Sequence, residues 1–506
     1  MLLENAVIRT MDSAAPIVET LAVRGDTIVA DEQAAGEHVD LEGCCVVPGF
    51  TDAHVHFPSW AMVQSWVRLE ECRTVDDVVG RVREAAAEAP HDRWLVGYGW
   101  GSGAWRSGRE PSRADLDPVT DGVPTALWSQ DYHSLWLNSA ALACAGGELE
   151  AGDGGVVAAD ARGRPTGLLG EEAAWRFRDR HIVFTIDEYA AATCEAIGLA
   201  HAQGLTAVHD YDGRIGAPRI WERVRDAGAL SLRVWQSVLW DEAAEFAAPA
   251  ANGEGADPFL RVGYLKVFMD GSLNSGTAHM LDGSGMEITS RDELEAIIRD
   301  ASPAGWPLAV HAIGDRANRD ALDAFEATRQ EWAPRGLRQR VEHAQHIHPD
   351  DIPRFGELGI ACSVQFTHAT TDRDAAERLV PHLLEGTYAF RSLWDSGVRL
   401  ANGSDAPVDV LDPLLGICAG VLRTVDDRPA WRAEQALTVQ QALEASTVNP
   451  AWLSGDEQRL GTLVPGRLAD LVVLDRDPLE CPSDGLPEVR VVATMVGGRW
   501  VFGPWR

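Results

Sequence analysis

The sequence CVVPGF at residues 45–50 is followed directly by TDAHVH at residues 51–56. The first piece is short, apolar and bounded by Pro48-Gly49, which is typical of a buried strand. In extended chain, residues i and i+2 point the same way, so His54 and His56 can face one metal ion. A lone His-x-His pair is more often structural. Its place after an apolar strand favours the metal-ligand interpretation here.

Seven more short apolar segments follow, with helical stretches between them. After the strand at 45–50, we expect strands at 205–209, 231–235, 262–267, 307–311, 339–343, 360–365 and 398–401. The helices include 290–304 and 316–332. Strands alternating with helices predict an α/β fold, a (β/α)8 barrel of the TIM type. The gap of about 150 residues after the first strand is too long for one βα unit, so we expect an insertion at about 58–200, lying over the active site.

Both ends of the chain contain short strand-like segments instead of helices. VRVVATMV at 489–496 and RWVF at 499–502 flank Gly497-Gly498, which is typical of a hairpin with a two-residue turn. We therefore predict one small sheet domain built from residues 1–48 and 452–506. The barrel domain is then 49–451, including the insertion.

Other predicted strands also end in residues of the kinds that bind metals. His311 and His343 close two strands, Asp405 follows the last one, and Lys266 lies inside another. The carboxyl ends of barrel strands meet at one mouth, where active sites lie. Each residue alone could be a packed histidine, a helix cap or a salt-bridged lysine. Their common place in separate βα units favours one joint metal site. Burial of Lys266 would lower its pKa.

Several segments together resemble a known family. They are PGFTDAHVH, LKVFMDGS, HAIGD, VEHAQ and NGSDAP, with the tail GTLVPGRLADLVVLDRDP. The chain resembles the amidohydrolase superfamily, more narrowly its amidohydrolase-3 branch, the YtcJ-like proteins related to N-substituted formamide deformylase. The resemblance spans essentially the whole chain. It implies a metal-dependent hydrolase on a distorted (β/α)8 barrel, with a small β-sandwich domain made from both termini. It also implies these metal ligands: His54, His56, a carboxylated Lys266 that bridges two ions, His311, His343 and Asp405.

The resemblance also implies a reaction. Two divalent ions, most simply zinc with manganese, iron or nickel as alternatives, would lower the pKa of a bridging water. Asp405 would take the proton of that water and deliver it to the leaving group. We expect hydrolysis of a C–N bond in an amide, N-acyl or N-formyl small molecule. A deaminase or cyclic-amide hydrolase, an ester- or carbohydrate-directed hydrolase and a non-catalytic scaffold protein remain alternatives.

Candidate substrate contacts are less specific. Tyr132, His133 and Trp100 lie in the insertion, and His209 ends the second predicted strand. Each could contact substrate or be packed in the interior. Residues that follow predicted strands could support the metal ligands or begin helices; they are Gln345, His346, Gln365 and His368.

Composition excludes several classes of function. The formal net charge is −33, which disfavours binding to nucleic acid or anionic membranes. No apolar run reaches the ~18 residues of a membrane span. The eight cysteines form no CxxC pair, and the N-terminus lacks the pattern of a secretory signal. We expect a cytoplasmic enzyme, with a homodimer as one candidate assembly.

Overall fold

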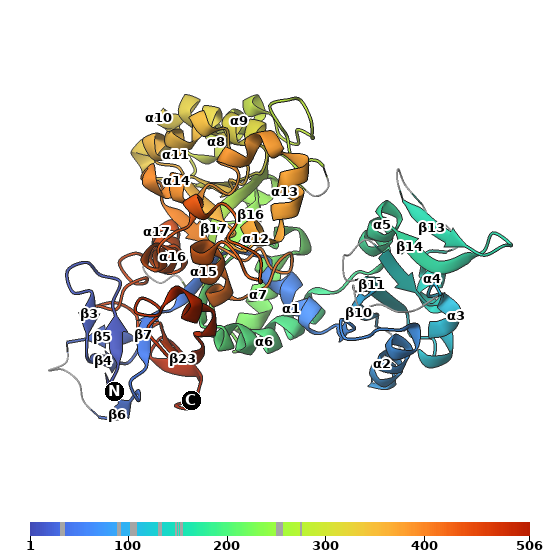
Figure 1. The fold of residues 1–506 in the computed structure, drawn as a ribbon, viewed down its shortest axis with the longest axis horizontal. Coiled ribbons are helices and arrows are strands. Elements are labelled where there is room, and N and C mark those ends of the chain that lie inside the picture. Colours follow the sequence, from blue (N-terminus) through green and yellow to red (C-terminus); the bar gives the residue numbers. More distant parts are fainter. Residues whose placement is uncertain are drawn as a thin grey trace. The chain divides into compact units, whose positions relative to one another are not determined.

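The computed structural model describes residues 1–30, 36–88, 93–101, 109–129, 134–146, 149, 151, 155–248, 257–273 and 276–506. These residues form two compact units (Figure 1). The first consists of Met1–Trp60 and Thr193–Arg506, and the second of Ala61–Ala192. Among the described residues, none of the helices combines the length and the hydrophobicity needed to cross a bilayer.

The first unit is built around one parallel sheet of eight strands, in the order β21-β20-β19-β18-β17-β16-β15-β8. The strands are β8 (Phe50–Val55), β15 (Leu205–Asp210), β16 (Arg233–Leu239), β17 (Leu260–Phe268), β18 (Leu308–Ala312), β19 (Arg340–His343), β20 (Ala361–Val364) and β21 (Leu400–Asn402). Helices between them include α7 (Ala217–Asp226), α8 (Arg291–Ala301), α9 (Asp315–Ala327) and α11 (Ile352–Leu358). The predicted barrel is confirmed.

The first barrel strand differs from the prediction. The apolar run at 45–50 splits at Pro48-Gly49 into β7 (Cys45–Pro48) and the start of β8. β7 leaves the barrel and pairs with β22 (Leu471–Leu474) and β2 (Val7–Arg9). Gly49 has no room for a side chain, since an added Cβ would lie 2.2 Å from the Thr206 hydroxyl. His54 therefore lies within a barrel strand and His56 directly after it.

The first and last barrel strands meet through the segment that follows β21. Asp405 N donates to His54 O at 2.7 Å, and His56 N donates to Ala406 O at 2.9 Å. Gly403 permits this approach, because a Cβ there would lie 2.4 Å from the backbone nitrogen of His54. The closure therefore fixes Asp405 beside His54 of β8 and His56, which directly follows this strand.

Two further sheets from the chain termini complete the first unit. One has the order β5-β4-β1-β6 and the other β24-β23-β22-β7-β2-β3. Their remaining strands are β1 (Leu2–Glu4), β3 (Ile17–Val18), β4 (Leu21–Arg24), β5 (Thr27–Val29), β6 (His38–Asp40), β23 (Val491–Val496) and β24 (Arg499–Phe502). Residues of both sheets share one apolar core, including Leu3, Ile28, Val46 and Met495. Both chain ends therefore belong to one sandwich (Figure 1).

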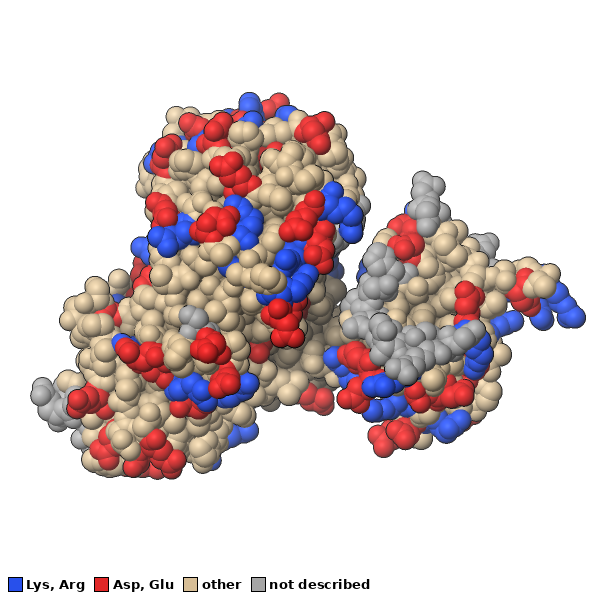
Figure 2. Space-filling view, in the orientation of Figure 1, with Lys and Arg blue, Asp and Glu red and all other residues tan. Residues whose placement is uncertain are grey.

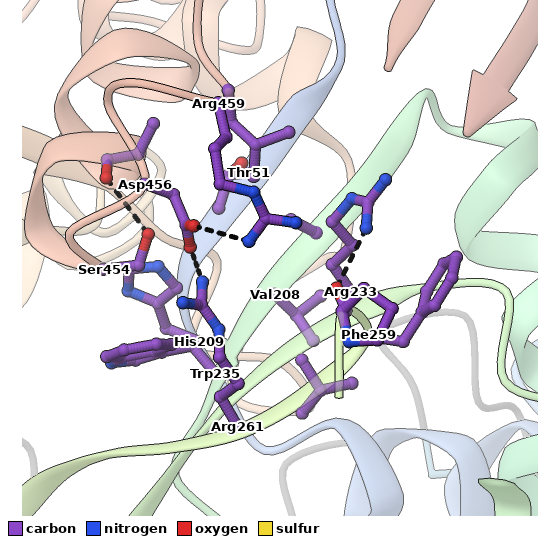
Figure 3. A pocket seen from close by; sticks show the side chains of 15 residues that line it. Thr51, Val208, His209, Arg233, Trp235, Phe259, Arg261, Ser454, Asp456 and Arg459 are labelled. Atoms are coloured by element: carbon purple, nitrogen blue, oxygen red, sulfur yellow. Dashed lines mark hydrogen bonds and ion pairs between the residues drawn. The ribbon is translucent and has the colours of Figure 1, made fainter. Parts of the chain in front are cut away.

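Arginine–carboxylate pairs join the sandwich to the amino-terminal end of the barrel. Arg233, at the start of β16, forms a buried ion pair with Asp470 at 2.6 Å. In the cavity beside it, Arg261 and Arg459 both pair with Asp456 (Figure 3). This end of a TIM-type barrel usually serves stability, and its paired charges fit that role.

The second unit has its own sheet, in the order β13-β14-β12-β11-β10-β9. The strands are β9 (Val67–Arg68), β10 (Leu95–Trp100), β11 (Thr125–Ser129), β12 (Ser134–Leu137), β13 (Val156–Ala159) and β14 (Pro165–Gly170). Helix α2 (Val75–Glu88) contributes Val78 and Val82 to one of its apolar cores. The unit lies within the insertion expected at about 58–200, whose position over the active site stays a prediction.

Arginines on the surface are often paired with carboxylates. Arg354, for example, contacts Asp323, Asp351 and Glu326 within 2.9 Å. Figure 2 shows blue basic side chains lying beside red acidic ones on the face in view. The surplus of acidic residues therefore sets the sign of the net charge, while many arginines are neutralised locally.

Candidate metal centre

The carboxyl ends of the barrel strands bring the predicted ligands together. Nε2 of His54 lies 3.6 Å from Oδ1 of Asp405, and Nε2 of His56 lies 3.3 Å from the same oxygen. The ring of His343 lies 4.9 Å from that of His54 and 4.5 Å from that of His311, between centroids. Five of the six predicted ligands are therefore linked by direct contacts in one cluster.

The backbone is strained at two of these residues. His343 has a φ of 72° and Asp405 a φ of 58°, both in the left-handed region. At the end of β19 this breaks the strand alternation, so that the adjacent Glu342 and His343 both reach His54. This conformation costs free energy at a residue other than glycine, and residues that adopt it concentrate at functional sites.

Each of the four histidines has one ring nitrogen within hydrogen-bonding reach of an acceptor. The pairs are His54 Nδ1 with Glu342 Oε2 at 2.6 Å, His56 Nδ1 with Asp212 Oδ1 at 3.2 Å, His311 Nε2 with Gly271 O at 3.1 Å, and His343 Nδ1 with Gln365 Oε1 at 2.8 Å. Such pairing fixes the tautomer and leaves the other nitrogen as a metal ligand.

The spacing of the ligand atoms suits metal ions. In the described part of the chain, His54, His56 and Asp405 can each place one ligand atom within 4.8 Å of the others. The same holds for His343, His368 and Asp405, so the two groups share Asp405. Imidazole nitrogen with carboxylate oxygen is a donor set that zinc and other divalent transition metals accept. His54, His56 and Asp405 therefore fit a divalent metal, whereas the predicted ligands His311 and Lys266 belong to neither group.

Lys266 is the sole lysine of the chain, since the other 43 of the 44 basic residues are arginines. It is 2% exposed on β17, and Nζ lies 4.7 Å from the ring centre of Tyr211 and 5.0 Å from that of Phe268. Among the described residues it has no ion pair, because Asp270 instead accepts bonds from the backbone of Ile313 and Gly314. Burial lowers the pKa of Lys266 to about 8. A substantial part of this amine is therefore neutral near pH 8.

A buried charge network supports His54. Glu342 accepts from His54 and, through Oε1, from the hydroxyl of Tyr211 at 2.9 Å. The guanidinium of Arg340 pairs with both oxygens of Glu342. Burial opposes the charge of Glu342, but Arg340 and His54 hold its pKa well below the usual range. Glu342 therefore remains an anion that holds Nδ1 of His54.

The sequence interpretation missed Glu342, Arg340, Asp212 and Tyr211. A signal was present at 340–343, since Arg340 and Glu342 alternate on one side of a strand that should be apolar. Two charges of opposite sign at i and i+2 inside a barrel strand indicate a buried pair. No comparable local pattern marks Asp212 or Tyr211.

The charges at the cluster are coupled. Burial opposes protonation of His56, yet Asp212 and Asp405 raise its pKa to about 10. Burial lowers the pKa of His54 to about 4, with the nearby Lys266 acting in the same direction. Asp405 is buried too, but its histidine neighbours hold its pKa well below the usual range. In the metal-free protein, Asp405 is therefore an anion.

The four candidate substrate contacts lie in different parts of the chain. His209 is buried inside the barrel, with Nδ1 2.9 Å from a guanidinium nitrogen of Arg340. Trp100 is 7% exposed in the core of the second unit, where Nε1 donates to Leu127 O. Tyr132 and His133 lie outside the described residues. A substrate role for all four stays a prediction.

The chain is similar to several known proteins. The model of the family described as Amidohydrolase family matches residues 37–502. Protein LONG AFTER FAR-RED 3 of Arabidopsis thaliana is 30% identical, covering 99% of this chain and 91% of its own length. N-substituted formamide deformylase of Arthrobacter pascens is 28% identical, covering 98% and 97%.

A crystal structure of an uncharacterized metal-dependent hydrolase from Pyrococcus furiosus superposes with a TM-score of 0.78 at 27% identity, covering 95% of this chain and 99% of the other. The fold agrees with the resemblance carried by the sequence motifs. Since the family model spans most of the chain, that resemblance is confirmed, and the chain belongs to the amidohydrolase family.

Proposed function

We propose that this protein is a metal-dependent hydrolase that cleaves the C–N bond of a small N-formyl or N-acyl compound. The observation that carries the proposal is the set of four histidines, each with one nitrogen held by an acceptor, beside the shared carboxylate of Asp405. The name of the deformylase relative makes a substituted formamide the first substrate to test. A divalent ion held there would lower the pKa of a water towards neutrality and polarise the substrate carbonyl.

The protein's own residues would handle the protons. Asp405, an anion in contact with His54 and His56, would accept a proton from the attacking water at its carboxylate. It would then deliver this proton to the departing nitrogen. Glu342 would keep the proton of His54 on Nδ1, and Asp212 would do the same for His56. The Nε2 atoms of both histidines then remain available as metal ligands.

Lys266 would provide the remaining anionic ligand. Its neutral Nζ would attack the carbon of carbon dioxide and lose one proton, which leaves a carbamate with a single negative charge. Burial, the lowered pKa of about 8 and the absence of an ion partner among the described residues support this role. We propose a pair of zinc ions held by His54, His56, His311, His343, Asp405 and this carbamate.

The test is metal content by elemental mass spectrometry on protein purified without added metal, for the parent and Lys266→Ala. The exposed His38 (63% side-chain exposure) provides a control, His38→Ala. We expect about two equivalents in the parent and the control and a sharp fall in Lys266→Ala, together with release of formate from N-benzylformamide by the parent.

Two other results would reject parts of the proposal. One equivalent that does not depend on Lys266 would point to a mononuclear, deaminase-like enzyme. No metal, even after reconstitution with zinc and bicarbonate, would reject the hydrolase and favour a non-catalytic protein.

A further inference from the structure

His368 lies beside the metal centre without belonging to the ligands that the sequence predicts. It begins the short helix α12 (His368–Thr371), shortly after β20, and is 7% exposed. One of its ring nitrogens lies within 4.8 Å of ligand atoms of His343 and Asp405. It therefore reaches the place where a substrate would have to bind to react.

Its Nε2 is buried and, within the described part of the chain, has no hydrogen-bond partner. A buried polar atom without a partner is uncommon and calls for an explanation, because desolvation costs about 1–3 kcal/mol when no bond replaces water. The Nε2 of Gln365, whose oxygen holds His343, is also buried without a described partner. His368 and Gln365, both beside the predicted ligand His343, thus each have one buried nitrogen without a described partner.

The hydrogen bonds around the cluster separate His368 from the metal ligands. His54, His56, His311 and His343 each have one nitrogen held by an acceptor, as histidines that bind metals almost always do. No such bond anchors His368 among the described residues. Its ring therefore lacks the support that a metal ligand has, although it lies close enough to contact the same molecule.

We propose that His368 is a catalytic residue that binds the reacting carbonyl group, an inference that rests on the proposed function. When water adds to the carbonyl carbon, the π electron pair moves to oxygen, and a ring N–H of His368 donates a hydrogen bond to the resulting oxyanion. The pair returns as the C–N bond breaks, and the departing nitrogen takes its proton from Asp405. His368 gains and loses no proton in this sequence.

The experiment measures binding of methylphosphonate, a tetrahedral anion that resembles the oxyanion intermediate, to the metal-loaded full-length protein by calorimetry. The variants are His368→Ala and His368→Gln, with His348→Gln as a control outside the site. Losing a hydrogen bond to a charged group should weaken binding by about 10-fold or more in His368→Ala. His368→Gln should recover part of the loss, because its amide can donate. The metal content of every variant should equal that of the parent.

Turnover gives a second readout. For N-benzylformamide we expect kcat to fall by roughly 10²–10³-fold in His368→Ala while KM changes little, as for other oxyanion donors. Equal methylphosphonate affinity in His368→Ala and the parent would overturn the inference, as would a metal-loaded parent that binds no methylphosphonate. Loss of a metal equivalent in His368→Ala would make His368 a ligand and overturn it too. A parent without metal would instead reject the proposed function.

Discussion

Lys266 is the residue whose chemistry is easiest to measure separately from that of the rest of the protein. Because it is the only lysine, any lysine signal from the folded protein reports on this one position. After reconstitution with zinc and ¹³C-bicarbonate, we expect a single carbamate carbon resonance by NMR. At a fixed concentration of dissolved carbon dioxide, its rate of formation should rise between pH 7 and pH 9, since the neutral amine becomes the main form above its pKa of about 8. Lys266→Ala should show no such resonance, and a resonance that persists in this variant would disprove the assignment.

Asp212 tests how the tautomer of a ligand is controlled. Its Oδ1 lies 3.2 Å from His56 Nδ1, while Oδ2 accepts from Ser59 N at 2.6 Å. In Asp212→Asn the single amide oxygen would remain with Ser59, so that the NH2 group faces His56 and moves its proton to Nε2. We expect the affinity for zinc to fall by about 10–100-fold, as measured by competition with a chelator.

The matched control for this change is Asp226→Asn on α7, where the side chain is 64% exposed. Zinc affinity there should equal that of the parent. An unchanged affinity in Asp212→Asn would mean that Asp212 does not set the proton position of His56.

At the scale of elements, strand β19 is unusual because it carries two buried charged side chains. Arg340 and Glu342 are both fully buried and paired with each other. Removing one partner of such a pair leaves an unpaired buried charge and costs about 3–5 kcal/mol. We expect Arg340→Met and Glu342→Leu each to lower the thermal midpoint strongly.

The double variant should be less destabilised than the sum of the two single variants, because no lone charge remains. If the double variant lowers the midpoint by as much as the two single variants added together, the two side chains do not stabilise each other. Circular dichroism of the metal-free proteins would supply all four midpoints.

How far the sequence predicts these elements depends on where the deciding contacts lie. His311 could be placed at a barrel mouth because the apolar run before it is local, and His343 because it closes a short segment of the same kind between two predicted helices. The division of 45–50 could not, since β7 depends on pairing with Leu471–Leu474 at the other end of the chain. Glu342 lies within a quoted motif, but its contact with His54 spans the barrel between β19 and β8. Local patterns locate the ligands, whereas the partners of the ligands require the closed barrel.

At the scale of the whole molecule, neutral buried histidines should make stability depend on pH. His346 is fully buried, its Nδ1 lies 2.9 Å from the Thr387 hydroxyl, and burial lowers its pKa to about 3. Between pH 6.5 and about 3 the unfolded chain binds a proton at this position that the folded chain does not. The folded state is thus destabilised as pH falls below 6.5, and above 6.5 this effect is absent.

We expect the free energy of unfolding of His346→Gln to be lower than that of the parent at pH 7.5. At pH 5.5 the difference between the two should be smaller by about 1.4 kcal/mol. Urea unfolding of the metal-free proteins at both pH values measures the difference. A constant gap between parent and variant would show that His346 takes up its proton at the same pH in the folded protein as in the unfolded chain.

The lone lysine on β17 has one more consequence. A lysine-specific protease has a single target in this chain, the bond after Lys266, and that bond lies in the middle of the barrel wall. The folded protein should resist cleavage, and each opening of the fourth barrel strand should yield the same two fragments. The rate of this single cut therefore reports how often the barrel opens, with no label and no variant.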